Sequence, residues 1–236
     1  MNYKIGVIIG GPSPEHDISV LTGLQSARIL SAKHDVSIIY WTKDNKWFLL
    51  DHKLESSDFV QNSKLLTKEL HINLGKDNCF TFKRKKLDID VYVNSCHGGP
   101  GEDGSLQGLL EVMEAKFTGP NLNIAQLCMD KYAFYSLMKS NNLPVLDKFK
   151  IKSGKTPDFE GPYVLKPQFG GSSIGVEVVK NYETALKILE TSDLYTKGAL
   201  LEKYLENADD LLIGVRNYPE FNYSEIEKPI RNSNLF

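Results

Sequence analysis

The sequence contains little cysteine, and its cysteines are not grouped. Among 236 residues there are three, Cys79, Cys96 and Cys128, which are odd in number and widely spaced, with no CxxC pair. A disulfide framework requires paired cysteines, and a structural zinc site requires closely spaced ligands. The sequence therefore predicts neither a disulfide framework nor a zinc site, no metal ligands are assigned in it, and it fits a reducing cytoplasm.

The sequence also lacks long apolar segments and an excess of either charge. No run approaches the ~18 apolar residues of a membrane span, and the apolar residues 5–9 are followed by Gly-Gly-Pro instead of a signal-peptide cleavage site. The 28 Lys and Arg against 30 Asp and Glu leave a formal charge of −2. This balance predicts no nucleic-acid or membrane partner, and the basic residues 83–86 are interpreted as a solvated turn or edge.

What remains is an ordinary globular composition, 41% hydrophobic and 25% charged. Apolar runs of strand length alternate with segments of helical spacing, which predicts an α/β fold. Residues 42–88 indicate only hairpin and short-helix material. The clearest expected elements are strands at residues 5–9, 36–41 and 91–96, helices at 19–30 and 105–113, and a helix that Asn123 caps and that runs to about residue 140.

The pattern changes near residue 120, beyond which a smaller antiparallel α+β unit is expected. Its predicted strands lie around Phe149 and at residues 163–165, 176–179 and 200–204, and its predicted helix at 182–190. A third segment opens at residues 211–215 without closing.

The first candidate site is the turn at residues 10–19, GGPSPEHDIS. Its glycine pair follows a predicted buried strand, which lets the backbone approach a ligand closely, and the helix beginning near Ser19 adds amide donors. Glu15 then lies past the carboxyl end of a strand, where open α/β sheets bind ligands. Alternatively, Glu15 and Asp17 merely favour the helix N-terminus. The turn is not G-x-G-x-x-G, so NAD binding is disfavoured.

A second glycine-rich turn, residues 97–104, follows another predicted buried strand. It holds His97, four glycines, Glu102 and Asp103. Parallel strands end at the same edge of a sheet, so His97 and Glu15 are expected to face one pocket. The alternative is a turn histidine whose hydrogen bonds are satisfied locally.

The third candidate site joins Lys166, at the end of a predicted strand, to the loop GGSSIG at residues 170–175. Such a loop of backbone donors and hydroxyls suits the covering of phosphates, although it is not a P-loop and an ordinary Gly-Ser hairpin is the alternative. Lys131 and residues 202–205, taken singly, are solvated charges. Lys131 and Lys166 together would neutralise much of the charge of a polyphosphate.

In this order, the segments resemble the D-alanine–D-alanine ligase family of the ATP-grasp superfamily, over essentially the whole chain. The resemblance implies an N-terminal Rossmann-like, parallel-sheet domain (residues 1–120), a central α+β ATP-grasp subdomain (121–206) and the beginning of a C-terminal ATP-grasp domain (207–236). The implied reaction is the ATP-dependent joining of two D-alanines through an acyl phosphate, for peptidoglycan precursors. The motifs that carry the family resemblance are residues 10–19, 97–108, 117–119, 129–131, 166–167 and 171–175.

The resemblance also implies a role for each matching residue. Glu15 would bind the ammonium group of the first D-alanine, Ser172 would hydrogen-bond Glu15, and His97 would lie near the acyl group. The expected nucleotide residues are Lys131 and Lys166 at the phosphates, Ser173 covering them through its amide, Glu202 and Leu205 at the adenine, and Asp210 at the ribose. Asp210 departs from the family's usual Glu, and Asp209 is the alternative.

Family members continue past the position of Phe236 into a region with an Arg, the ligands of two magnesium ions and a glycine oxyanion site. We therefore expect about the first two-thirds of a ligase, with magnesium or manganese held only by the longer protein and no ligation by this chain alone. The longer protein is expected to be a cytoplasmic homodimer. The alternatives are a D-alanine–D-lactate or D-alanine–D-serine ligase, or an inactive nucleotide- or amino-acid-binding module.

Overall fold

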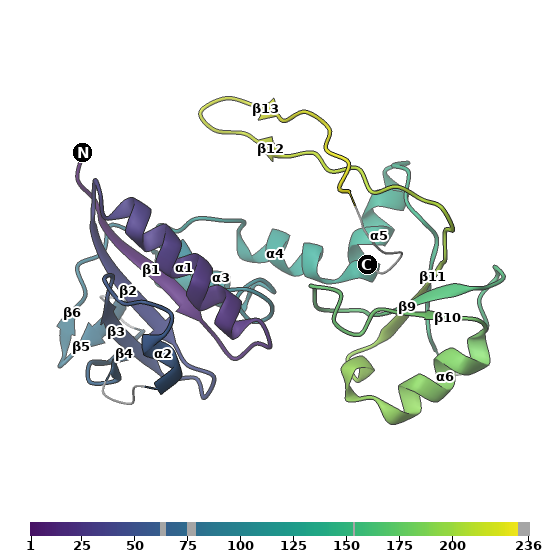
Figure 1. Cartoon of the computed structure of the whole chain (residues 1–236), viewed down its shortest axis with the longest axis horizontal. Helices are drawn as coiled ribbons and strands as arrows, with labels where there is room; N and C mark the ends of the chain where they lie inside the picture. Colours follow the sequence, from purple (N-terminus) through teal and green to yellow (C-terminus); the bar gives the residue numbers. More distant parts are fainter. Residues whose placement is uncertain (62–64, 75–78, 153, 231–236) are drawn as a thin grey trace. The chain divides into compact units, whose positions relative to one another are not determined.

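The computed structural model describes residues 1–61, 65–74, 79–152 and 154–230 (Figure 1). By its internal contacts the chain divides into two units. The first unit comprises residues 1–143 with 169–171, and the second comprises residues 144–168 and those from 172 onward. This division concerns packing, and the three predicted domains stay a prediction.

Three parallel strands form one end of a seven-stranded sheet in the first unit. Its order is β6-β5-β4-β3-β2-β1-β7, in which β1 pairs in parallel with both β2 and β7 and the remaining pairs are antiparallel. The predicted α/β fold with a parallel sheet is therefore confirmed, and the strands described between residues 47 and 86 extend that sheet. The strands are β1 (Lys4–Gly10), β2 (Asp35–Trp41), β3 (Trp47–Asp51), β4 (Glu69–Asn73), β5 (Cys79–Phe82), β6 (Lys85–Lys86) and β7 (Val91–Asn94).

The two faces of this sheet carry separate hydrophobic clusters because successive side chains of a strand point to opposite faces. Ile5, Val7 and Ile9 of β1 pack with the apolar side of helix α1 (His16–Leu30). Ile8 packs on the other face, in a cluster that contains Leu106 and Leu110 of helix α3 (Ser105–Val112). Helices therefore cover both faces of β1, which explains its almost wholly apolar sequence.

The predicted helix from Asn123 to about residue 140 is wrong in its start and its continuity. The structure has two helices, α4 (Leu122–Met129) and α5 (Lys131–Ser140), and the cap of α4 is Asn121, whose side chain accepts from Ile124 N. Asp130 separates them in an extended conformation. Its carboxylate accepts the backbone N–H groups of Tyr132 and Ala133 at 2.9 and 3.1 Å, so it caps a second helix where one continuous helix was expected.

The second unit contains an antiparallel four-stranded sheet in the order β10-β9-β11-β8. Helix α6 (Tyr182–Thr191) covers one face, where Leu165, Val179 and Leu201 pack around Ala185 (Figure 1). The predicted antiparallel α+β unit is thus confirmed. Its strands are β8 (Lys148–Lys150), β9 (Tyr163–Pro167), β10 (Glu177–Val179) and β11 (Ala199–Lys203).

The opposite face of this sheet, here called the lysine face, follows from the strand register. Leu200 pairs with both Lys150 and Lys166, and Glu202 pairs with Lys148 and Val164. These six residues therefore share one face, on which three lysines accompany a single carboxylate.

Short elements complete the described chain. The exposed basic residues 83–86 form the turn and edge strand β6, as the sequence predicts. Short elements elsewhere are α2 (Asp58–Gln61), η2 (Asp193–Tyr195), β12 (Val215–Arg216) and β13 (Asn222–Tyr223). In the part of the chain that the structure describes, no helix combines the length and the apolar character that crossing a membrane requires.

Candidate active site

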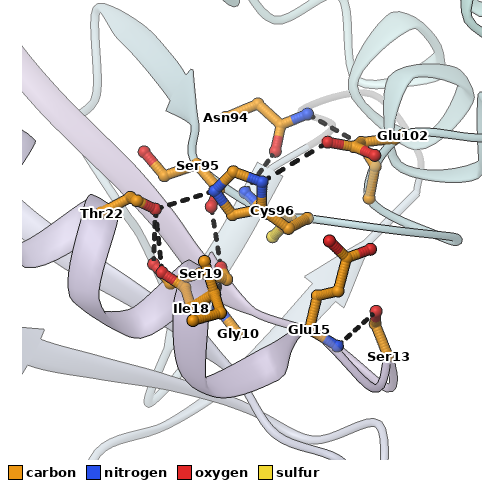
Figure 2. Close-up of polar contacts among 12 residues, drawn as sticks. Gly10, Ser13, Glu15, Ile18, Ser19, Thr22, Asn94, Ser95, Cys96 and Glu102 are labelled. Atoms are coloured by element: carbon orange, nitrogen blue, oxygen red, sulfur yellow. Dashed lines mark hydrogen bonds and ion pairs between the residues drawn. The ribbon is translucent and has the colours of Figure 1, made fainter. Parts of the chain in front are cut away.

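Ser19 joins the two glycine-rich turns at the carboxyl ends of β1 and β7. Its hydroxyl accepts the backbone N–H of Gly10 at 2.7 Å and donates to the carbonyl of Ser95 at 2.8 Å (Figure 2). Ser19 is fully buried, so both hydrogen bonds form away from water, where they hold the backbone firmly. The predicted meeting of the two turns at one edge of the sheet is therefore present within the first unit.

His16 holds the backbone of the first turn in place. One ring nitrogen, Nδ1, lies 2.7 Å from the carbonyl of Gly11, and Nε2 lies 3.0 Å from the hydroxyl of Tyr40. A carbonyl only accepts, so Nδ1 carries the proton and Nε2 accepts from Tyr40. Burial first, and then the charges of Asp17 and Asp44, raise the pKa of Tyr40, which keeps this hydroxyl protonated.

Glu15 precedes His16, and its carboxylate lies directly beside the second turn. A Cβ atom at Gly98 would come within 2.7 Å of Glu15 Oε2 and 2.4 Å of Ser13 Oγ, which is closer than real contacts allow. Gly98 also has a φ of +71°, a conformation that favours glycine. The carboxylate of the first turn and the bare backbone of the second turn therefore lie close together.

His97 lies between α1 and the second turn. Its Nε2 is 3.0 Å from Thr22 Oγ1, and its Nδ1 is 3.6 Å from Glu102 Oε1. The Thr22 hydroxyl donates its proton to the carbonyl of Ile18 at 3.1 Å, so it is free to accept from Nε2–H. The carboxylate of Glu102 therefore lies on the Nδ1 side of the ring, and the hydroxyl of Thr22 lies on the Nε2 side.

Asn94 and Gln107 hold the second turn in shape. Their side-chain amides both donate to the carbonyl of Gly101, at 2.9 and 3.0 Å, and Asn94 Oδ1 accepts the N–H of Cys96 at 3.0 Å. The carboxylate of Asp103 accepts the backbone N–H of Ser105, the first residue of α3, at 3.0 Å. Of the two acids in this turn, therefore, Glu102 faces His97 and Asp103 shapes the backbone.

Lys131 is the first residue of α5, and its Nζ donates to the carbonyl of Gly170 at 2.6 Å. Lys131 thereby contacts the glycine-rich loop that the sequence predicts to cover phosphates. Within that loop Ser172 and Ser173 have φ values of +49° and +55°, and both residues are exposed. Ser173 O accepts from Val176 N at 3.1 Å, which closes a turn.

A buried carboxylate lies at the centre of the lysine face. Glu202 accepts from Lys166 Nζ at 2.6 Å and also forms an ion pair with Lys148. Burial by itself raises the pKa of Glu202, but the hydrogen bonds and charges of the two lysines outweigh it and leave the pKa below its ordinary value. Glu202 is therefore ionised, and the cluster of two ammonium groups and one carboxylate keeps a positive charge that suits an anionic ligand.

The remaining predicted nucleotide residues lie near the end of β11 and beyond it. Leu205 and Asp210 are exposed. Asp209 forms an ion pair with Lys228 at 2.8 Å. The assignment of the ribose to Asp210, with Asp209 as the alternative, stays a prediction.

The structure thus places the predicted residues in two groups. Glu15 and the turn of His97 meet in the first unit, and Lys166 and Glu202 meet in the second. The expected contact between Glu15 and Ser172 and the joint action of Lys131 and Lys166 each involve both units, and they stay predictions. Within the described ranges no three His, Cys, Asp or Glu side chains gather in a way that would hold a metal ion.

Sequence reasoning missed residues that hold the site together, above all Ser19, Asn94 and Lys148. Each contacts a part of the chain that is distant in sequence, or supports a backbone carbonyl, so no local motif reveals it. The hydroxyl of Ser19 bonds 76 residues away, and Lys148 pairs 54 residues away. The one local signal was position: His16 and Ser19 lie inside the first glycine-rich motif.

Comparison with known proteins identifies the family of the chain. The family model described as D-ala D-ala ligase N-terminus matches residues 4–120. The D-alanine–D-alanine ligase of Thermosipho africanus is 32% identical over 261 residues, which cover 99% of this chain and 67% of that protein. A crystal structure of D-alanine–D-alanine ligase from Helicobacter pylori superimposes with a TM-score of 0.81 at 26% identity, over 97% of this chain and 72% of that one.

A structure of D-alanine–D-alanine ligase from Bacillus anthracis complexed with ATP has the same fold, with a TM-score of 0.59 at 23% identity over 96% of this chain and 72% of that one. The chain belongs to the D-alanine–D-alanine ligase family, whose members are ligase enzymes. It spans about two-thirds of the length of the curated relatives that it matches.

Proposed function

We propose that this chain carries the D-alanine site and part of the ATP site of an enzyme that joins two D-alanines for peptidoglycan precursors. In the proposed reaction a phosphoryl group passes from ATP to the carboxylate of the first D-alanine, giving ADP and an acyl phosphate. The amine of the second D-alanine then attacks the acyl carbon, and inorganic phosphate leaves. The observation that carries the proposal is the carboxylate of Glu15 against the bare backbone of Gly98.

Glu15 would bind the ammonium group of the first D-alanine. A carboxylate past the carboxyl end of β1 offers the charge that an amino-acid substrate requires, and the absence of a side chain at Gly98 lets this carboxylate lie against the backbone of the second turn. His97, polarised by Glu102, would lie near the reacting acyl group and stabilise its developing negative charge. Ser172 would hydrogen-bond Glu15 and help to hold a loop over the substrate.

ATP would lie against the lysine face. Lys166 and Lys131 would contact its phosphates, because ammonium groups offset their mutual repulsion, and the amide of Ser173 would cover them. Glu202 and Leu205 would border the adenine, and Asp210 would bind the ribose. The excess of lysine over carboxylate on this face supports an anionic ligand.

The other features of the proposal concern the whole enzyme. A divalent cation, magnesium or manganese, would neutralise phosphate charge. Within the described residues, no three His, Cys, Asp or Glu side chains gather in a way that would hold it. A cytoplasmic homodimer is proposed on the family resemblance alone. D-Lactate or D-serine as second substrate, and an inactive binding module, remain the alternative functions.

Direct binding tests the D-alanine site. We expect this chain to bind D-alanine more tightly than L-alanine in calorimetric titration, and Glu15→Gln to weaken D-alanine binding at least about tenfold, because the ammonium group loses its charge partner. Asp17→Asn is the control, since it removes the same charge two residues away at an exposed position paired with Lys43. Equal binding by Glu15→Gln and Asp17→Asn would remove Glu15 from the site.

A chimera tests the reaction. Residues 1–230 of this chain, continued by the C-terminal third of the Thermosipho africanus relative, should release phosphate from ATP only when D-alanine is present, and should form the dipeptide. Phosphate release without dipeptide when D-alanine is the only amino acid, with product appearing after D-lactate or D-serine is added, would favour the alternative second substrates.

A further inference from the structure

Glu202 has two lysine partners, and its position in the sheet distinguishes them. Lys148 lies directly across from Glu202 in the pairing of β8 with β11. Lys166 lies across from Leu200, so it reaches Glu202 along the diagonal. Directly opposed side chains are the closest neighbours in an antiparallel sheet, and diagonal neighbours are farther apart. Lys148 is therefore the cross-strand neighbour of Glu202, and Lys166 reaches the carboxylate from the diagonal position.

Side-chain exposure also distinguishes the two lysines, because Lys148 is less exposed than Lys166. The side chain of Glu202 is 5% exposed, that of Lys148 is 16% exposed, and that of Lys166 is 24% exposed. A buried carboxylate is costly unless a positive charge compensates it. With two ammonium groups at hand, one lysine can leave Glu202 and the carboxylate still has a partner.

Lys166 is the lysine that is closer in the chain to the proposed phosphate-binding loop. It lies next to the last residue of β9, and residues 170–175, the glycine-rich loop, follow closely in the chain. The proposed function brings a nucleotide polyphosphate to Lys166. Bound phosphate would compete with Glu202 for this ammonium group, because both are anionic oxygen acceptors.

We propose that Lys148 is a positioning residue of the nucleotide site: it remains on Glu202 as the compensating charge, which releases Lys166 to the phosphates of the bound nucleotide. This inference rests on the proposed function, because it requires that the chain bind a nucleotide triphosphate. Lys148 itself contacts no phosphate in this proposal and acts through Glu202 and Lys166.

A double-mutant cycle tests the inference. The affinity of this chain for the non-hydrolysable analogue AMP-PNP, and separately for adenosine, is measured by titration calorimetry. Lys148→Met should weaken AMP-PNP binding at least about tenfold, because Lys166 is then the sole compensating charge for Glu202 and stays there; adenosine binding should change much less. In a Glu202→Gln background the same Lys148→Met change should have little further effect on AMP-PNP binding, because no carboxylate then retains Lys166.

Matched variants separate this role from a general loss of charge or of fold. Lys152→Met removes an exposed lysine just beyond the end of β8 and should leave both affinities unchanged, and Lys148→Arg should restore AMP-PNP binding to within about threefold. Circular dichroism verifies folding, and Lys148→Gln replaces Lys148→Met if the methionine variant does not fold.

Each outcome is decisive. If the unaltered chain binds AMP-PNP and Lys148→Met behaves like Lys152→Met, the role of Lys148 is wrong while the proposed nucleotide site stands. An equal loss of AMP-PNP and adenosine affinity, or a loss that persists in full in the Glu202→Gln background, would also overturn it. If the unaltered chain binds no AMP-PNP, then the proposed ATP site fails and the inference fails with it.

Discussion

At the scale of single residues, the candidate site depends on atoms that are missing as much as on those present. Gly98 places its backbone where any side chain would collide with Ser13 and Glu15. Ser19 joins the two turns with one hydroxyl group. The carboxylate of Glu15 is thereby held close to the bare backbone of the second turn.

Replacing Gly98 by alanine should disturb the position of Glu15. The new Cβ would lie 2.4 Å from Ser13 Oγ and 2.7 Å from Glu15 Oε2, so Glu15 must move, and the positive φ adds about 1–2 kcal/mol of strain. We expect D-alanine binding to fall at least about tenfold in calorimetric titration, with a loss of stability in urea of about 1–3 kcal/mol.

Gly119→Ala is the control for backbone strain. Gly119 also has a positive φ, +106°, but a Cβ there meets nothing within 4 Å. Its stability should fall while D-alanine binding is kept. Equal D-alanine affinities for Gly98→Ala and Gly119→Ala would show that the approach of Gly98 to Glu15 does not shape the site.

At the scale of elements, the carboxyl ends of β1 and β7 are held in place by the contact of α1 with the sheet. Gly23 of α1 lies against β1 so closely that a Cβ would come within 2.1 Å of Ile9 Cγ2 and 3.3 Å of Ser95 Cβ. Since Ser95 also accepts the hydrogen bond from Ser19, the same contact region contains the link between the two turns. Packing of the helix and geometry of the site are therefore coupled.

This coupling predicts an unusual result for Gly23→Ala. Inside an exposed helix face, replacing Gly by Ala raises stability by about 1 kcal/mol. Here the added methyl group must displace α1 from β1, so we expect a loss of about 1–3 kcal/mol in the free energy of unfolding by urea. Gln25→Ala, at an exposed position of the same helix, should be nearly neutral. A stability gain in Gly23→Ala would contradict the close seating of α1.

At the scale of the whole molecule, the chain contains two separately packed units with different chemistry. The first carries the carboxylate of Glu15 beside the turn of His97, and the second carries the lysines that surround Glu202. The second unit includes the buried cluster of Glu202, and its stability should therefore respond to pH through that carboxylate.

The pKa of Glu202 is lowered in the folded state, where Lys148 and Lys166 outweigh burial. The unfolded chain therefore takes up its proton first as the pH falls. The stabilisation is fully present above the ordinary glutamate pKa of about 4.3, and it is lost as the pH falls from there through the lowered pKa. We expect urea midpoints to decline below about pH 4.3, and this part of the decline to be absent in Glu202→Gln.

Glu190→Gln supplies the control, because it removes an exposed glutamate at the end of α6 in the same unit. It should keep the decline of the unaltered chain. At neutral pH, Glu202→Gln should also cost stability, at or below the ~3–5 kcal/mol typical of breaking a buried ion pair, because the lysines reach solvent. Parallel pH curves for Glu202→Gln and Glu190→Gln would show that the Glu202 cluster contributes no pH dependence.

The sequence by itself determined the fold class, the order of the main strands and helices, and the glycine-rich turns that carry Glu15, His97 and Lys166. These features depend on local patterns, namely apolar runs and glycines after strands. Each such pattern is contained within a short segment of the sequence. The sequence also indicated that the two turns meet, because parallel strands end at one edge of a sheet.

Only the tertiary structure decided the residues that join distant segments. Ser19 on Ser95, Gly98 beside Glu15, and Lys148 on Glu202 bring together positions that no local pattern connects. The break between α4 and α5 was also decided there, since Asp130 satisfies the amides of a new helix where apolar spacing favoured one long helix. Local spacing shows which face of an element is apolar, but pairing of strands and burial decide which polar groups on the other face meet.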